Sequence, residues 1–150
     1  MTGGKPLPGA EPSGVLMSIR SRHVRSIVAG TKTYELRRKI PRVLVGMSIF
    51  IYSSGEDRAV TACAEVAGVD SGPPETIWSK YEKVLGVTRE EFDDYFEGAD
   101  LAHALQLDKV QANKSPITLE ELRSDFGIEP PQSWRYLSHE SLNRFVVHGF

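Results

Sequence analysis

The sequence lacks the features that define several classes of protein. Cys63 is its only cysteine, which excludes a disulfide framework and a cysteine-based metal site and fits a reducing compartment. No apolar run approaches the roughly 18 residues that a membrane-spanning helix needs. The first residues contain no hydrophobic stretch of the kind found in secretory signals. We therefore expect a cytoplasmic protein.

Aliphatic side chains are scarce at the start of the chain. Residues 1–14 hold four glycines and three prolines, and we expect them to form a disordered N-terminal lead. The remaining chain has the length of one domain, with 40% hydrophobic and 25% charged residues over all 150 positions. Such a composition supports a packed core. We expect residues 15–150 to form a single domain.

Acidic residues are scarce in one further segment, although the net charge is only −2. Between Arg20 and Arg42, eight lysines and arginines accompany a single acid, Glu35. The rest of the chain is strongly acidic, so we expect one face to be positive and to bind an anionic partner. The alternative is that these cations pair with the acidic helices expected over residues 73–98 and only decorate the surface.

The spacing of apolar residues predicts strands and helices of uneven length. A helix is expected after Ser21, its predicted N-cap, and ends at Gly30. Further helices are expected from Pro73, after Thr88, after Thr118 and after Ser138. Strands or extended segments are expected at residues 15–20, 32–38, 48–52, 59–69, 101–110 and 130–137. The irregular connections argue against repeated βαβ units and favour an α+β fold, a small, mixed, mostly antiparallel β-barrel of five to six strands decorated with helices.

The cationic segment alternates like a strand. In a strand over residues 32–38, Tyr34 and Leu36 face the core, whereas Glu35 and Arg37 stand side by side on the outer or cavity face. A carboxylate beside a guanidinium fixes the orientation of that guanidinium for a phosphate or a base edge. Lys32 and Glu35 point to opposite faces of an ideal strand, so only a twist or bulge would bring them together. Arg20, Arg22 and the first turn of the following helix would add an anion site.

These residues resemble a known signature. Gly30, Lys32, Glu35 and Arg37 match the G-x-K-x-x-E-x-R pattern of the ASCH domain, part of the PUA-like superfamily, and the resemblance extends over about residues 15–137. The acidic insertion IWSKYEKVLGVTREEFDDYFEG and the closing PPQSWRYL resemble a bacterial subset described as predicted transcriptional regulators. The resemblance implies a five- or six-stranded barrel that binds RNA or a nucleotide. Its cleft would be lined by the signature and by the loop Tyr52-Ser53-Ser54.

The resemblance leaves the chemistry open. Some small members of the family are amidohydrolases that act on an acylated cytidine, and some are ribonucleases. Lys32 matches the lysine of the amidohydrolase type, but that type carries threonine at the position of Glu35. Its catalytic glutamate has no evident counterpart near Leu85.

Two functions follow as hypotheses. The first is a binding module for RNA or a nucleotide, with a regulatory role. Its candidate site residues are Arg20, Arg22, Lys32, Glu35, Arg37, Arg38, Tyr52, Ser53, Ser54, Trp134 and Arg135. The second is a hydrolase of a modified nucleoside or of RNA, with Lys32 as nucleophile or proton carrier and Glu35 as general base. A third reading has the acidic helices of residues 73–98 dock a protein partner.

Aromatic residues and histidines give weaker indications. Trp134 and Tyr136 flank Arg135 in an extended segment, where they either stack on bases or close the barrel core. The four histidines show no metal-ligand spacing, and we expect them at the surface. We expect no metal and no cofactor.

Overall fold

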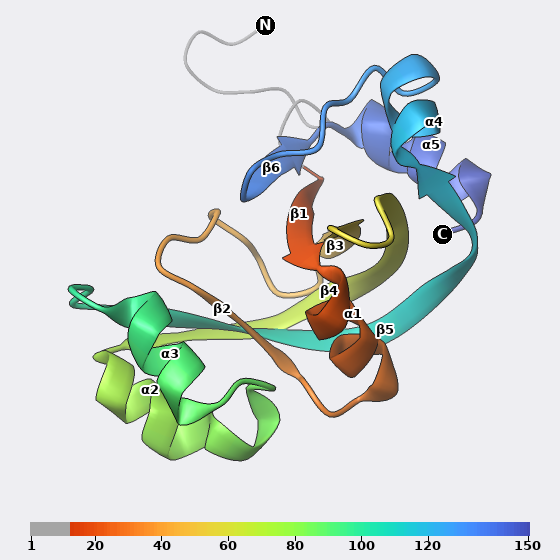
Figure 1. Ribbon diagram of the computed structural model, residues 1–150. Helices are drawn as coiled ribbons and strands as arrows, with labels where there is room; N and C mark the ends of the chain where they lie inside the picture. The colour runs from red at the N-terminus through yellow and green to blue at the C-terminus, as the bar shows by residue number, and fades with distance from the viewer. Residues whose placement is uncertain (1–12) are drawn as a thin grey trace, which may run out of the picture.

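The structure, a computed structural model, describes residues 13–150 and consists of one sheet surrounded by helices (Figure 1). The expected N-terminal lead lies outside the described residues except for Ser13 and Gly14, and Gly14 begins the first strand. The six strands are β1 (Gly14–Arg20), β2 (Tyr34–Arg37), β3 (Ser48–Ser54), β4 (Ala59–Gly72), β5 (Ala102–Thr118) and β6 (Trp134–Leu137). The helices are α1 (Ser21–Ala29), α2 (Pro74–Tyr81), a 3-10 turn (Glu82–Val84), α3 (Arg89–Phe96), α4 (Leu119–Ser124) and α5 (His139–His148).

The sheet has the order β2-β5-β4-β3-β1-β6. All neighbours are antiparallel except β1 and β3, which run parallel. The long strands β4 and β5 bend as they cross the molecule, so the sheet curls into a half-barrel with β2 and β6 at its two edges (Figure 1). The predicted α+β fold with a mixed, mostly antiparallel, barrel-like sheet of six strands is confirmed.

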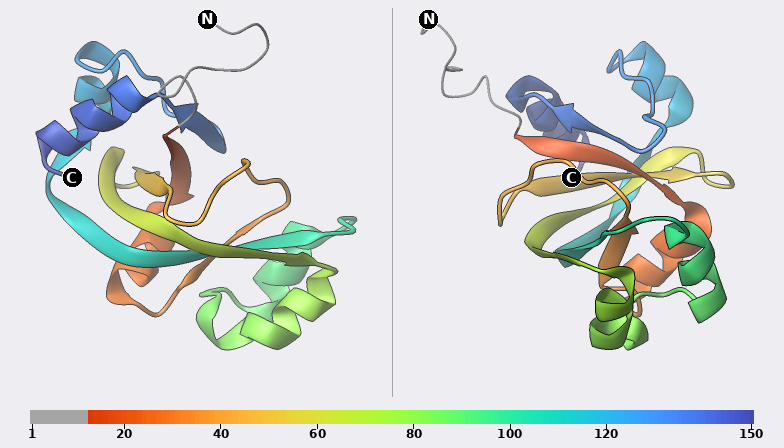
Figure 2. Two further views of the ribbon diagram at one scale, coloured as in Figure 1. Left: turned by 180° about the vertical axis from the view of Figure 1, so that it is seen from behind. Right: turned by 90° about the vertical axis from the view of Figure 1, so that its left-hand side faces the viewer.

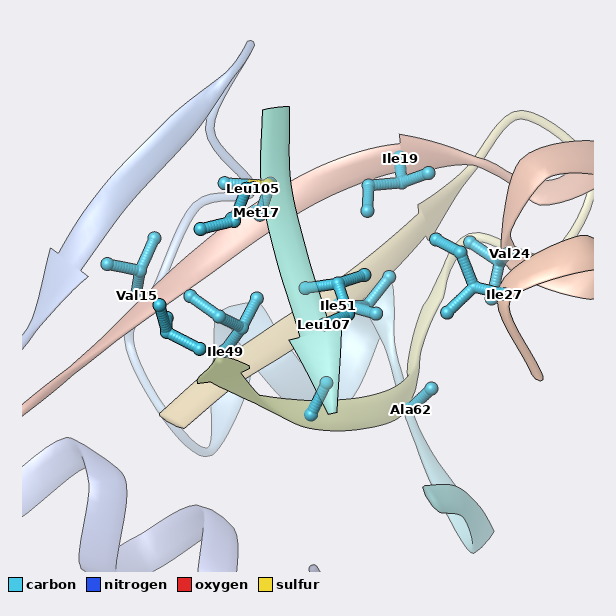
Figure 3. Close-up of a cluster of buried hydrophobic side chains, with 12 residues drawn as sticks. Val15, Met17, Ile19, Val24, Ile27, Ile49, Ile51, Ala62, Leu105 and Leu107 are labelled. Atoms are coloured by element: carbon cyan, nitrogen blue, oxygen red, sulfur yellow. The ribbon is translucent and has the colours of Figure 1, made fainter. Parts of the chain in front are cut away.

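The concave side of the sheet holds the main core. Alternate residues of β1 and β3 point inward, among them Val15, Met17 and Ile51, and they form one cluster with Val24 and Ile27 of α1 (Figure 3). Buried residues recur at every second position along the strands and at a spacing of three on the helix, because each element turns one face to the core. The core places α1 beside the C-terminal ends of β1 and β3.

Two further clusters cover the opposite ends of the sheet. α4, α5 and β6 lie at one end, where Phe50 and Phe145 pack edge to face with ring centroids 5.0 Å apart. α2 and α3 lie at the other end (Figure 2), where Phe92 and Phe96 cluster with Leu36 of β2. The helices α2 and α3 therefore stand beside the edge strand that carries the cationic segment.

Local signals account for most helix ends. Thr88 and Thr118 form complete capping boxes with Glu91 and Glu121, as the sequence predicts. Gly30 ends α1 in the left-handed conformation, with φ 85°. Ser138 caps α5 by accepting from the backbone N–H of Ser141.

The N-cap expected at Ser21 is wrong. Arg20 occupies the cap position, and no side chain caps this helix end. The hydroxyl of Ser21 instead donates to the Ser54 carbonyl at 2.9 Å and accepts from Ser53 and from the Asp57 backbone N–H. It therefore fixes α1 to the turn after β3.

All six strands differ from their predicted bounds by at least one residue, and β5 differs most. β2 begins at Tyr34 and not at residue 32, and β5 continues to Thr118 because it follows β4 through several register shifts. Within residues 13–150, no helix is both long and apolar enough to cross a membrane.

Candidate functional site

A cleft of about 580 Å³ opens between α1, β2, α3 and the segment before β6. Its volume lies within the range of small-ligand pockets. β1 and α1 supply one wall, β2 the floor, and α3 with the loop before it the facing wall. The lining residues are Ser18, Ile19, Arg20, Arg22, His23, Lys32, Glu35, Leu36, Arg37, Ser54, Val87, Glu91, Phe92, Tyr95, Gln132 and Ser133.

The floor of the cleft is a buried cluster of three charged side chains. Glu35 lies between two cations, with one carboxylate oxygen 3.7 Å from Lys32 Nζ and the other 2.8 Å from Arg37 Nη2. Each of the three residues is less than a tenth exposed. Removing one partner of such a cluster leaves an uncompensated buried charge, so the three groups stabilise one another's position.

Lys32 reaches Glu35 because it precedes the strand. Its backbone N–H donates to the Ser26 carbonyl at 3.1 Å, in the turn that follows α1, and strand alternation therefore does not apply to it. Its ammonium donates to the Leu85 carbonyl at 2.5 Å. Gly86 lies against it with φ 69°, and a Cβ there would come within 2.8 Å of Lys32 Cβ. The loop before α3 thus covers Lys32.

Arg37 joins the two edges of the half-barrel. Besides its bonds to Glu35, its guanidinium donates to the Ser18 carbonyl at 2.8 Å and to the Ser133 hydroxyl at 3.0 Å. These partners lie on β2 itself, on β1 and just before β6. Most of its N–H groups are therefore committed to the protein.

The cleft shifts two pKa values. Burial, more than any nearby charge, lowers the pKa of Lys32; Arg37 and Arg22 lower it further, and Glu35 opposes them. Burial also lowers the pKa of His23, with Lys32 and Arg22 adding to the effect. The lowered pKa favours the neutral form of His23, which can accept a proton, and makes the neutral form of Lys32 more accessible than in water.

The mouth of the cleft carries two more arginines. Arg20 is exposed, and Arg22 forms an ion pair with Glu91 of α3 at 2.7 Å, which links the two walls. Glu91 has a pKa of about 2, held down first by the Thr88 backbone N–H and then by Arg22. Among the lining residues four cations thus face two carboxylates. The lining keeps a positive excess although one arginine is paired with an acidic helix.

The structure brings some of the predicted site residues together and places others elsewhere. Those that line the cleft are Arg20, Arg22, Lys32, Glu35, Arg37 and Ser54. Arg38 lies outside and donates to the Tyr95 and Glu97 carbonyls at 2.9 and 3.0 Å, at the end of α3.

The other predicted residues do not line the cleft. Tyr52 is buried in the core beneath α5, and Ser53 is buried against Ser21 and Asp57. Trp134 packs against the main core, whereas Arg135 is exposed outside the cleft lining. The loop Tyr52-Ser53-Ser54 therefore contributes only its last residue.

Several lining residues carry no local signal of their role. His23, expected at the surface, is half-buried in the cleft; its place beside Arg22 in the first turn of a helix could have indicated it. Ser133 is 96 positions from Arg37 and becomes a neighbour only through the sheet order. In the part of the chain that the structure describes, no group of three or more histidines, cysteines or acids could hold a metal ion.

Comparison with known proteins gives consistent matches over most of the chain. Residues 12–124 match a family described as a domain of unknown function, DUF365. An ASCH domain-containing ribonuclease from Zymomonas mobilis is 32% identical over 134 residues, covering 87% of this chain and 88% of that protein. The crystal structure of ASCH from Zymomonas mobilis matches with a TM-score of 0.86 and 29% identity, over 92% of this chain and 96% of that one.

A more distant structure shows the fold alone. The N-terminal domain of McrB from Staphylothermus marinus matches with a TM-score of 0.59 at 9% identity, over 98% of this chain and the whole of that one. The fold and the similarity to the Zymomonas protein identify the class of protein, which is an ASCH domain protein. This chain belongs to the family described as DUF365 and, through its Zymomonas relative, to the ASCH domain proteins.

Proposed function

We propose that this protein binds single-stranded RNA in the cleft and cleaves it. The observation that carries the proposal is the cleft itself, in which a cationic lining surrounds a buried lysine whose pKa is lowered. A positive concave surface attracts a polyanion, and groups with shifted pKa values in a cleft are typical of catalytic sites. The relative described as a ribonuclease, similar over most of both chains, supports the same reading.

Arg20 and Arg22 are the proposed phosphate contacts. Both lie at the mouth of the cleft with exposed side chains, and arginine meets phosphate with two parallel hydrogen bonds. The guanidinium of Arg37 is committed to Ser18, Glu35 and Ser133. We therefore propose that Arg37 holds the site together and does not contact the ligand.

Lys32 is the proposed proton carrier. RNA cleavage by the adjacent 2′-hydroxyl forms a bond from that oxygen to phosphorus, breaks the bond to the 5′-oxygen, and needs one proton removed and one supplied. The ammonium of Lys32 supplies the proton to the departing oxygen, and neutral His23 takes the proton from the hydroxyl. Glu35 is a positioning residue, because one of its carboxylate oxygens lies 3.7 Å from Lys32 and the other lies 2.8 Å from Arg37.

A second candidate is hydrolysis of a modified nucleoside. The observation that favours it is the buried lysine beside a carboxylate, since a neutral lysine can attack or deprotonate at an acyl group. Acylated cytidines offered to the same preparation distinguish it from RNA cleavage.

The test is an assay with an end-labelled single-stranded RNA of mixed sequence. Wild-type protein is compared with Lys32→Met, which keeps the length of the side chain, and with Lys114→Met, an exposed lysine outside the cleft. We expect cleavage by wild type and by Lys114→Met, and a loss of about 100-fold or more in Lys32→Met with a folded protein by circular dichroism. Equal cleavage by all three proteins would contradict the role of Lys32, and no cleavage by wild type would contradict the proposed function.

A further inference from the structure

The two walls of the cleft differ in chemistry. One wall carries Arg20 and Arg22, whereas the α3 side presents Val87, Phe92 and Tyr95 together with Glu91, the carboxylate that pairs with Arg22. A nucleotide has the same division, with a charged phosphate at one end and a flat apolar face on its base. The arrangement of the walls therefore fits a nucleotide whose base lies against the α3 side.

Tyr95 is the most exposed of these three side chains. It is 44% exposed, whereas Val87 is partly buried and Phe92 is buried in the cluster with Phe96. An exposed tyrosine is unremarkable on its own, but this one borders a cationic cleft. Its ring lines the same cleft as the arginines that would meet phosphate.

The position of Tyr95 is fixed from two sides. Arg38 donates to the carbonyls of Tyr95 and Glu97, which holds the C-terminal end of α3 against the segment after β2. The ring of Phe96 meets the ring of Tyr95 edge to face, with centroids 4.8 Å apart and planes at 78°. An aromatic ring held before the ligand arrives loses little conformational entropy on binding.

The two aromatic residues of β6 have different surroundings. Tyr136 is exposed outside the cleft lining, where its hydroxyl accepts from the Arg42 backbone N–H at 2.9 Å and its ring meets Trp134 edge to face. Trp134 is partly buried against the main core. Neither residue lines the cleft.

We infer that a base stacks on the ring of Tyr95, and that the cleft binds one unpaired nucleotide between this ring and the arginines of β1 and α1. The inference rests on the proposed function and adds a base subsite to it. Stacking requires a base that is free of a partner strand, and every base offers a π face, so the subsite favours single strands and tolerates any sequence.

Two oligomers of equal length test the subsite, an oligoadenylate and the corresponding abasic ribose-phosphate chain. Their affinities are measured by fluorescence anisotropy for wild type, Tyr95→Ala, Tyr95→Phe and the control Tyr136→Ala, which removes a ring of similar exposure outside the cleft. Cleavage of the same oligoadenylate is followed in parallel.

We expect wild type to bind the oligoadenylate about 10- to 100-fold more tightly than the abasic chain. Tyr95→Ala should lose most of that ratio by weakening only the oligoadenylate, while Tyr95→Phe and Tyr136→Ala keep it. Equal affinities for both chains in wild type, or an unchanged ratio in Tyr95→Ala, would overturn the inference while cleavage by wild type left the proposed function standing. Binding of neither chain by wild type would overturn both.

Discussion

The guanidinium of Arg37 donates to the hydroxyl oxygen of Ser133 at 3.0 Å, and this bond joins the two edges of the curled sheet. Arg37 lies on β2, and Ser133 immediately precedes β6. The cleft lies at this junction, so the same side chain that closes the half-barrel also holds Glu35 on its floor.

Replacing Ser133 and replacing Arg37 should lower the free energy of unfolding by different amounts. Ser133→Ala removes one hydrogen bond and should lower the free energy of unfolding by about 1 kcal/mol. Arg37→Met also leaves Glu35 buried with only Lys32 at 3.7 Å and should cost about 3 kcal/mol or more. Arg37→Lys should not restore stability, because an ammonium cannot reach all three partners.

Chemical denaturation measures these costs, with Arg135→Met as the control for loss of an exposed arginine nearby. If Arg37→Met were no more costly than this control, the junction would have no structural role.

The contact between Gly86 and Lys32 predicts a loss of activity from a small substitution. Gly86 and Gly98 both have positive φ, 69° and 77°, so alanine at either position should cost about 1–2 kcal/mol of stability. Only at Gly86 would the new Cβ collide with Lys32, at 2.8 Å; at Gly98 nothing lies within 4 Å. We therefore expect RNA cleavage to fall in Gly86→Ala and to persist in Gly98→Ala at a temperature where both are folded. Similar activities in the two variants would show that the loop does not position Lys32.

Burial of Lys32 predicts a pH dependence of stability. The folded protein lowers the pKa of Lys32, whereas the unfolded chain keeps the ordinary value of 10.5. Between these two pKa values the unfolded chain binds one more proton, so the free energy of unfolding rises with pH. Lys32→Met lacks this contribution.

The measurement is the free energy of unfolding of wild type minus that of Lys32→Met across the alkaline range. The difference should grow in favour of wild type as pH rises toward 10.5. A difference independent of pH would contradict a lowered pKa.

The ion pair between Arg22 and Glu91 predicts that removing the carboxylate of Glu91 strengthens RNA binding and lowers stability. Glu91→Gln keeps the capping box, because the amide oxygen still accepts from Thr88, but it releases Arg22 from a competing carboxylate. RNA affinity should increase by about 2- to 5-fold. Unchanged or weaker RNA binding would contradict a phosphate contact at Arg22.

The same variant has a defined pH profile. The pKa of Glu91 is about 2 in the folded protein and 4.5 in its ordinary state. Its stabilising contribution is present above 4.5 and is lost as pH falls toward 2. The stability deficit of Glu91→Gln should therefore vanish over that range.

The sequence predicts those features of the fold that depend on residues close together along the chain, such as the ends of helices. The two threonine capping boxes and the αL glycine at the end of α1 follow from residue types alone. The grouping of Arg20, Arg22, Glu35 and Arg37 follows as well, because β1, α1 and β2 are consecutive. Strand alternation predicts the wrong face for Lys32, because the turn after α1 and not the strand determines its direction.

The rest of the site depends on long-range pairing that the sequence does not reveal. The parallel pairing of β1 with β3 and the placing of β6 beside β1 bring Ser133 to Arg37 and direct Trp134 toward the core. The wall from α3 depends on helices packed on Leu36. None of these contacts leaves a periodic or spaced pattern along the chain.

The salt dependence of RNA binding tests the central claim most directly. For a single strand, each phosphate contact contributes about 0.7 to the slope of log affinity against log salt concentration. Arg20→Gln, at the mouth of the cleft, should reduce the magnitude of that slope by about 0.7, and Lys114→Gln, outside it, should leave the slope unchanged. Equal slopes for wild type and Arg20→Gln would contradict the binding of RNA in this cleft.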